Sequence, residues 1–180
     1  MRKTTLVVAI MALTLVVGGG TALATTSDCN GGVCEGTYRA DTLDGFPKRN
    51  VMYGLGGTDA LYASGGEDRL SGNADGDKMY GGSGKDFFRG GLVADDMYGR
   101  SGNDSFYGEG GADHFNGGPG NYRTTGGLGS DELLGGEDND AITAQDGVFD
   151  VIHCRPSGYD AVVIDKGLDS YRNGENVYWQ

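Results

Sequence analysis

The chain has 180 residues, of which 36 are glycine and 3 are proline, and acidic side chains outnumber basic ones by 26 to 14. The formal charge of −12 excludes nucleic acid as a natural partner, because phosphate binding requires lysine and arginine. So much glycine costs backbone entropy wherever the chain is ordered. The fold therefore needs an additional source of stability, such as a cation that neutralises the acidic groups.

Residues 1–24 have the features of a secretory signal peptide. Arg2 and Lys3 form a positively charged start, Leu6–Val17 is apolar, and Ala22–Ala24 provides small residues for cleavage. The apolar stretch is short for a membrane-spanning helix, which needs about 20 residues, so a retained anchor is the less favoured alternative. We expect an extracellular protein, free or held at the cell surface, with no membrane span after signal cleavage.

Residues 25–35 form an N-terminal segment that contains two of the three cysteines. Cys29 and Cys34 flank a flexible Asn-Gly-Gly-Val link. Export permits disulfides, so these two cysteines could close a small ring. That pairing would leave Cys154 without a partner.

Residues 36–143 repeat with a period of nine and no insertion. Counted from Gly36, glycine fills the first position in eleven of twelve repeats, aspartate the sixth in ten, and a large apolar residue the eighth in eleven. The glycine-rich hexapeptide favours a turn, and the three residues after the aspartate alternate outward, inward and outward as in a short strand. One such strand cannot bury its apolar residue alone, but stacked copies can, which predicts an all-β solenoid.

The aspartate column has two interpretations. Aspartate can shape a turn by accepting a backbone hydrogen bond, but asparagine does this equally well. Asparagine fills the sixth position only at Asn50, although it is frequent at the fifth, so the column selects charge. Stacked carboxylates about 5 Å apart repel one another unless a cation lies between them. Calcium accepts about six to eight oxygen ligands in loose geometry, and we favour it over magnesium and over turn formation alone.

Four repeats carry a resemblance to a known family: GGSGKDFFR, GRSGNDSFY, GEGGADHFN and GGLGSDELL. They resemble the G-G-x-G-x-D-x-apolar-x nonapeptide of RTX (hemolysin-type) calcium-binding proteins. The resemblance implies a right-handed parallel β-roll of about twelve repeats, two per turn, with several Ca²⁺ ions between turns on both edges. It implies the carboxylate ligands Asp59, Asp68, Asp77, Asp86, Asp95, Asp104, Asp113, Asp131 and Asp140. It also implies carbonyl ligands from Gly57, Gly66, Gly84, Gly102, Gly111 and Gly129.

Some repeats depart from the pattern. Arg39 and Lys48 replace the fourth-position glycine, so we expect the first two repeats to form a cap that binds metal poorly or not at all. Tyr122 replaces a carboxylate, so the sites beside Asp104 and Asp140 are expected to be weak.

Residues 144–180 continue the pattern after a one-residue slip, as degenerate repeats and a cap. Strand-like segments follow Asp150, Asp160 and Asp169. The segment resembles the closing segment of small secreted RTX-like proteins of actinobacteria. Such tails usually carry a second cysteine between asparagine and glutamate, where this chain has Gly174, so the resemblance also leaves Cys154 unpaired.

The repeats and the C-terminal segment occupy nearly all of the chain after residue 24, and no H-E-x-x-H or G-x-S-x-G motif is present, so we expect no enzyme. The sequence favours a secreted calcium-binding protein whose roll folds as it binds metal. The alternative is a structural or adhesive module, stiffened by calcium, that presents exposed tyrosines to a protein or cell-wall partner.

Overall fold

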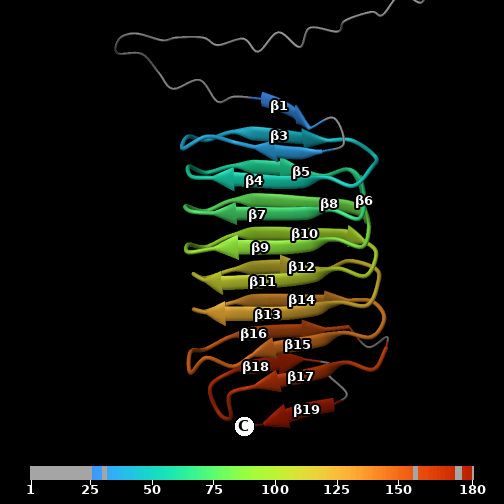
Figure 1. Ribbon diagram of the computed structural model, residues 1–180. Helices are drawn as coiled ribbons and strands as arrows, with labels where there is room; N and C mark the ends of the chain where they lie inside the picture. Colours follow the sequence, from blue (N-terminus) through green and yellow to red (C-terminus); the bar gives the residue numbers. More distant parts are fainter. Residues whose placement is uncertain (1–25, 30–31, 156–157, 173–175, 180) are drawn as a thin grey trace, which may run out of the picture.

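The computed structural model describes residues 26–29, 32–155, 158–172 and 176–179. The signal peptide expected over residues 1–24 lies outside the described residues. In the described ranges every regular element is a β-strand, and the strands stack into two sheets that run side by side (Figure 1). No helix in this part of the chain is long and apolar enough to cross a membrane.

Successive strands alternate between the two sheets, apart from the short β6, so the chain coils. The first sheet contains β1 (Thr26–Cys29), β3 (Thr42–Gly45), β5 (Ala60–Tyr62), β6 (Gly65–Gly66), β8 (Lys78–Gly84), β10 (Asp96–Ser101), β12 (His114–Asn116), β14 (Glu132–Gly136), β16 (Val151–Cys154) and β18 (Ser170–Arg172). The second contains β2 (Val33–Glu35), β4 (Val51–Leu55), β7 (Arg69–Asn73), β9 (Phe87–Gly91), β11 (Ser105–Gly110), β13 (Arg123–Leu128), β15 (Ala141–Ala144), β17 (Ala161–Ile164) and β19 (Asn176–Trp179).

Neighbouring strands are parallel, and through the repeats their register advances by two nonapeptides. Met79 of β8 pairs with Leu61 of β5 on one side and with Met97 of β10 on the other. Two repeats therefore make one turn of the coil, as the resemblance implies. Beyond the repeats Glu132 pairs with Val151, which confirms the one-residue slip.

The expected β-roll is confirmed, but the expected count of about twelve repeats is too low for the coil. β1 and β2 pair with the first repeat strands, and β16 to β19 extend the same two sheets at the other end. The segments 25–35 and 144–180 therefore contribute strands to the roll. A strict count in nines misses these strands, because the period slips and the glycine pattern is degenerate there.

The eighth-position side chains form the core between the sheets. The largest of them are at most 1% exposed: Leu43, Met52, Leu61, Leu70, Met79, Phe88, Met97, Phe106, Phe115, Leu133 and Ile142. The rings of Phe88 and Phe106, on neighbouring strands, stack with centroids 4.7 Å apart. Each strand supplies essentially one large apolar side chain, so the core is narrow and the turns must carry much of the stability.

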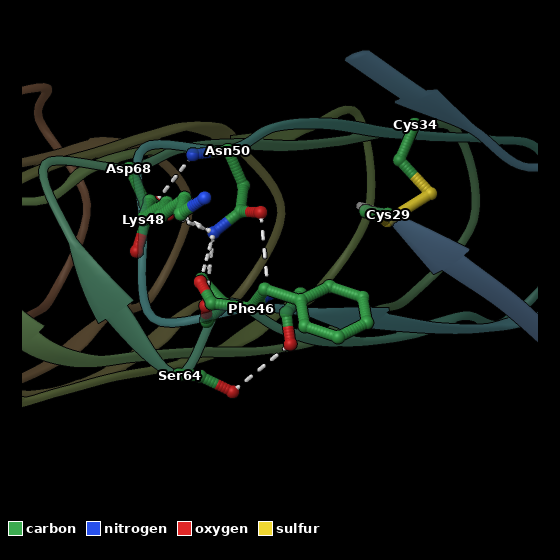
Figure 2. The surroundings of a disulfide bond; sticks show 9 residues. Cys29, Cys34, Phe46, Lys48, Asn50, Ser64 and Asp68 are labelled. Atoms are coloured by element: carbon green, nitrogen blue, oxygen red, sulfur yellow. Dashed lines mark hydrogen bonds between the residues drawn. A yellow bond between two sulfur atoms is a disulfide. The ribbon is translucent and has the colours of Figure 1, made fainter. Parts of the chain in front are cut away.

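The cysteines lie as the sequence indicates. Cys29 of β1 and Cys34 of β2 form a disulfide with a Cα–Cα distance of 5.2 Å, at the N-terminal end of the roll (Figure 2). Among the described residues Cys154 is the free cysteine, and it is buried.

The alternation of inward and outward side chains can be tested with two adjacent phenylalanines. Phe88→Ala leaves a cavity in the core and should lower the free energy of unfolding by about 3–5 kcal/mol. Phe87→Ala, which truncates an outward-facing ring on the same strand, should cost about 1 kcal/mol or less. Urea unfolding of both variants in one buffer measures the difference, and equal losses would contradict the assigned faces.

Candidate metal centre

The glycine-rich hexapeptides form turns that stack along both edges of the roll. Gly84 and Gly102 adopt left-handed φ angles of 132° and 138°. A Cβ atom on Gly102 would collide with the carbonyl oxygen of Gly84 in the preceding turn, so only glycine permits this approach. Gly66 and Gly84 have the same relation. The fourth-position carbonyl oxygens therefore lie between successive turns.

The sixth-position side chains form two buried rows, one along each edge. The first row consists of Asp41, Asp59, Asp77, Asp95, Asp113, Asp131, Asp150 and Asp169. The second row consists of Asn50, Asp68, Asp86, Asp104, Tyr122, Asp140 and Asp160. Apart from Asp169, every member is at most 3% exposed. The structure thus brings together all the aspartates that the resemblance implies as ligands.

From Asp59 onward in the first row and Asp68 onward in the second, one carboxylate oxygen of each aspartate accepts a hydrogen bond from the preceding turn. Asp77 Oδ1 accepts a hydrogen bond from the Asp59 N–H at 2.7 Å, and Asp95 Oδ1 accepts one from the Asp77 N–H at 2.7 Å. The second row repeats this contact, with Asp86 Oδ1 and the Asp68 N–H at 2.9 Å. This bond needs only an acceptor, so it does not by itself explain why the rows contain aspartate rather than asparagine.

The other carboxylate oxygen is buried and accepts no hydrogen bond from the described residues. We call these atoms the open oxygens: Oδ2 of Asp59, Asp68, Asp77, Asp86, Asp95, Asp104, Asp113, Asp131, Asp140, Asp150 and Asp160. In the repeats whose first position is glycine, the open oxygen lies against that glycine. A Cβ atom on Gly72, for example, would overlap Asp77 Oδ2 and lie 3.0 Å from the carbonyl oxygen of Gly90 in the next turn. Oxygens from two turns therefore converge where a buried charge most needs a partner.

The contacts of Asn50 show which atoms surround the position that an open oxygen occupies in the aspartate repeats. Its Nδ2 donates to the carbonyl oxygens of Phe46 at 3.0 Å, Lys48 at 2.5 Å and Ala63 at 3.0 Å, and to Asp68 Oδ1 at 2.9 Å (Figure 2). These acceptors are the second and fourth residues of its own repeat and the first and sixth residues of the next turn. In the aspartate repeats an open oxygen takes the place of this nitrogen.

Burial raises the pKa of the row carboxyls from Asp59 to Asp150 in the first row and from Asp68 to Asp140 in the second. The pKa of Asp95 rises to about 8, and those of Asp77 and Asp86 to about 7. Neighbouring row carboxylates raise these values, while the hydrogen bond from the preceding turn lowers them. The rows therefore favour a neutral state, which either protons or a bound cation can provide.

The oxygen ligands available between the turns fit calcium. Within the described ranges no three histidine, cysteine, aspartate or glutamate side chains gather at one point. A cation between turns would therefore take carboxylate oxygens from successive aspartates and its other ligands from backbone carbonyls. Such an all-oxygen set suits Ca²⁺, whereas zinc and other transition metals prefer nitrogen or sulfur ligands.

Two further aspartates belong to the rows, although the sequence did not identify them as ligands. Asp150 and Asp160 are 0% exposed, and each carries an open oxygen. Their Oδ1 atoms accept hydrogen bonds from the N–H groups of Asp131 at 2.8 Å and Asp140 at 3.0 Å. The slip in period conceals them, but an aspartate directly before an outward–inward–outward strand was the available signal.

Tyr122 interrupts the second row. Its ring is buried and lies against the first-position Gly117, in the space that a carboxylate occupies in other repeats. Its N–H still donates to Asp140 Oδ1 at 2.8 Å, so the stacking bond survives without the charge. The weak sites expected beside Asp104 and Asp140 stay a prediction.

A comparison with protein-family models finds the RTX calcium-binding nonapeptide repeat in four copies, over residues 35–70, 62–97, 89–123 and 125–148. The chain belongs to this RTX repeat family. The matches include most of both rows, and the family identifies Ca²⁺ as the ion that such repeats bind. A comparison with curated proteins gives no significant match.

The raised pKa values predict how a calcium-free RTX roll responds to pH. Because the row carboxyls from Asp59 to Asp150 and from Asp86 to Asp140 have pKa values of about 6 to 8, above the usual 3.8, the folded state binds more protons than the unfolded state. With a chelator present, stability should be highest below about pH 4 and fall as the pH rises through about 6 to 8. Circular dichroism during a pH titration measures this. With saturating calcium the trend should weaken or reverse, because Ca²⁺ competes with protons. Loss of structure on acidification in chelator would contradict the prediction.

Proposed function

We propose that the protein is a secreted calcium-binding protein whose β-roll folds as several Ca²⁺ ions bind between successive turns. The carrying observation is the contrast between Asn50 and the aspartates of the same rows. At Asn50 a donor nitrogen sits among four oxygens. At each open oxygen an acceptor replaces that donor, so the oxygens are left to repel one another unless a cation joins them.

The contacts of Asn50 indicate which atoms would hold each ion. Around Asp86 the corresponding atoms are the carbonyl oxygens of Gly82, Gly84 and Gly99 and the carboxylate of Asp104. The same correspondence assigns one fourth-position carbonyl ligand to each repeat that has glycine there and aspartate at the sixth position, namely Gly57, Gly66, Gly84, Gly102, Gly111 and Gly129. The bound ion would supply positive charge, and the chain would hold the carbonyl and carboxylate oxygens around it.

The roll depends on this charge because its core is narrow. One large side chain per strand has to offset the ordering of many glycines and the burial of two rows of carboxylates. If calcium exceeds its dissociation constant about tenfold, each filled site adds about 1.4 kcal/mol. Several sites together then contribute as much as the whole net stability of an ordinary domain.

Export fits this dependence. The signal-like features of residues 1–24 support secretion. Calcium is scarce in the cytosol and abundant outside cells, so the chain would remain unfolded until it has crossed the membrane. Folding would then follow at the place where the protein acts, free in the medium or at the cell surface.

A second candidate function is a calcium-stiffened adhesive module. The outer face of the first sheet carries three tyrosines, Tyr62, Tyr80 and Tyr98, whose rings stack with centroids 4.9 Å apart. Such a flat, partly exposed aromatic surface suits a macromolecular contact. Both candidates require calcium, and they differ in whether a protein or cell-wall partner exists.

Calcium titration tests the proposed function directly. In chelator at neutral pH the chain should lack most of its strand structure, and added Ca²⁺ should produce it cooperatively, as measured by far-UV circular dichroism. Magnesium at the same concentrations should have little effect, because it prefers a strict octahedron and retains its water. A folded spectrum that neither chelator nor calcium changes would overturn the proposal.

Asp95→Asn separates the metal role of the row from its structural role. The asparagine keeps the oxygen that accepts from Asp77 and adds a donor, as at Asn50. Equilibrium dialysis should show that the variant binds less calcium. In chelator, urea unfolding should show that its free energy of unfolding is higher by about 1–3 kcal/mol, because a buried acceptor becomes a donor. Asp44→Asn, on the outer face, is the matched control and should change neither quantity. A calcium-free roll weakened by Asp95→Asn would contradict this account.

A further inference from the structure

The two ends of the roll differ from its interior in how the row side chains are satisfied. In the first row, Asp41 Oδ2 accepts hydrogen bonds from the Thr37 N–H at 2.5 Å and from the Thr37 hydroxyl at 2.8 Å. In the second row, Asn50 donates to four oxygens. The open oxygens begin only at the next aspartate in each row, Asp59 and Asp68.

We propose that the side-chain nitrogen of Asn50 replaces a calcium ion. Protein hydrogen bonds satisfy the row side chains in the N-terminal turns of both rows, so these turns bind no calcium. This inference rests on the proposed calcium function. Asn50 is fully buried, and its amide nitrogen lies within 3.0 Å of all four oxygens. That nitrogen carries two hydrogens for four acceptors, so it acts as a compact positive centre. A calcium ion has no space beside it.

The donors at Asp68 support the same assignment. Asp68 Oδ1 accepts both the Asn50 N–H at 2.6 Å and the Asn50 Nδ2 at 2.9 Å. The Asp68 oxygen that faces the first turn is therefore satisfied by two protein donors, and only the other oxygen is open. In the interior, the one bond that Asp95 Oδ1 accepts from the described residues comes from the preceding turn, at Asp77.

The C-terminal end of the first row is closed in a similar way. Asp169 Oδ2 accepts a hydrogen bond from the Asp165 N–H at 2.7 Å, four residues earlier in the chain. The Thr37 N–H stands in the same relation to Asp41. The open oxygens of this row therefore lie between two ends that protein donors complete.

A closed N-terminal end gives the calcium-dependent turns a structure on which to form. Figure 2 shows the Cys29–Cys34 disulfide in the same region as Asn50. A covalent link and a set of metal-independent hydrogen bonds thus hold the first turns together. In a stacked repeat protein, each further turn can add to a neighbour that is already ordered.

Calcium stoichiometry tests the proposal. Equilibrium dialysis with calcium should show that Asn50→Asp binds one more ion per chain than the unchanged protein. Asn121→Asp is the matched control, because this exposed residue also uses Oδ1 to accept a backbone hydrogen bond, at 2.8 Å from Asn139. It adds the same charge outside the rows and should leave the count unchanged. In chelator, Asn50→Asp should also lose residual protection from hydrogen exchange in the first turns.

Asp41→Asn provides an independent test if Asn50→Asp does not fold. It should leave the number of calcium ions bound per chain unchanged, whereas Asp95→Asn should lower this number. Absence of calcium binding by the unchanged protein would overturn the proposed function itself. Normal binding, with either no gain in Asn50→Asp or a loss in Asp41→Asn, would overturn only the assignment of the closed N-terminal end.

Discussion

Each interior turn of the roll buries a carboxylate with two different tasks. Oδ1 accepts a hydrogen bond from the preceding turn and so fixes the stacking, as between Asp77 and Asp59. Oδ2 faces oxygens of its own turn and the next, and this leaves charge that the chain does not neutralise with the donors of its described residues. The first-position glycine leaves room for this oxygen, and the fourth-position glycine lets the turns approach. The narrow core cannot outweigh such a cost, so the fold depends on how the second oxygen is satisfied.

Asparagine would satisfy the fold alone, and Asn50 shows how. Its oxygen remains available as an acceptor, while its nitrogen completes the surrounding carbonyls. A row built from asparagine would stack without metal. A row built from aspartate lacks that independence, and under the proposed function its folded state responds to calcium instead. The choice between two isosteric side chains therefore separates a permanent solenoid from a conditional one.

Within residues 36–143 the period of nine was sufficient to predict the core and the rows. Phe88 and Asp86 stand in the eighth-position and sixth-position columns, and the burial of both follows from stacking alone. The role of Thr37 could not be predicted, because its contact with Asp41 depends on the path of the first turn rather than on spacing. Asp160 was not predicted as a ligand, because the spacing between it and Asp150 is longer than a nonapeptide. In the sequence, Asn50 is only a departure from the repeat. The proposal that its nitrogen replaces an ion depends on its hydrogen-bond partners, which the sequence does not show.

The two rows are unequal, and this has a consequence for how binding propagates. In the first row the open oxygens run without interruption from Asp59 to Asp150, and each aspartate lies between two turns. An ion that orders one turn thereby positions a carboxylate for the next site, which couples neighbouring sites. In the second row Tyr122 separates Asp104 from Asp140, so coupling through shared carboxylates stops there, although its backbone bond to Asp140 continues the stack. Under the proposed function, the first row therefore transmits calcium-dependent order along all its open turns, while the second row transmits it within two separate groups.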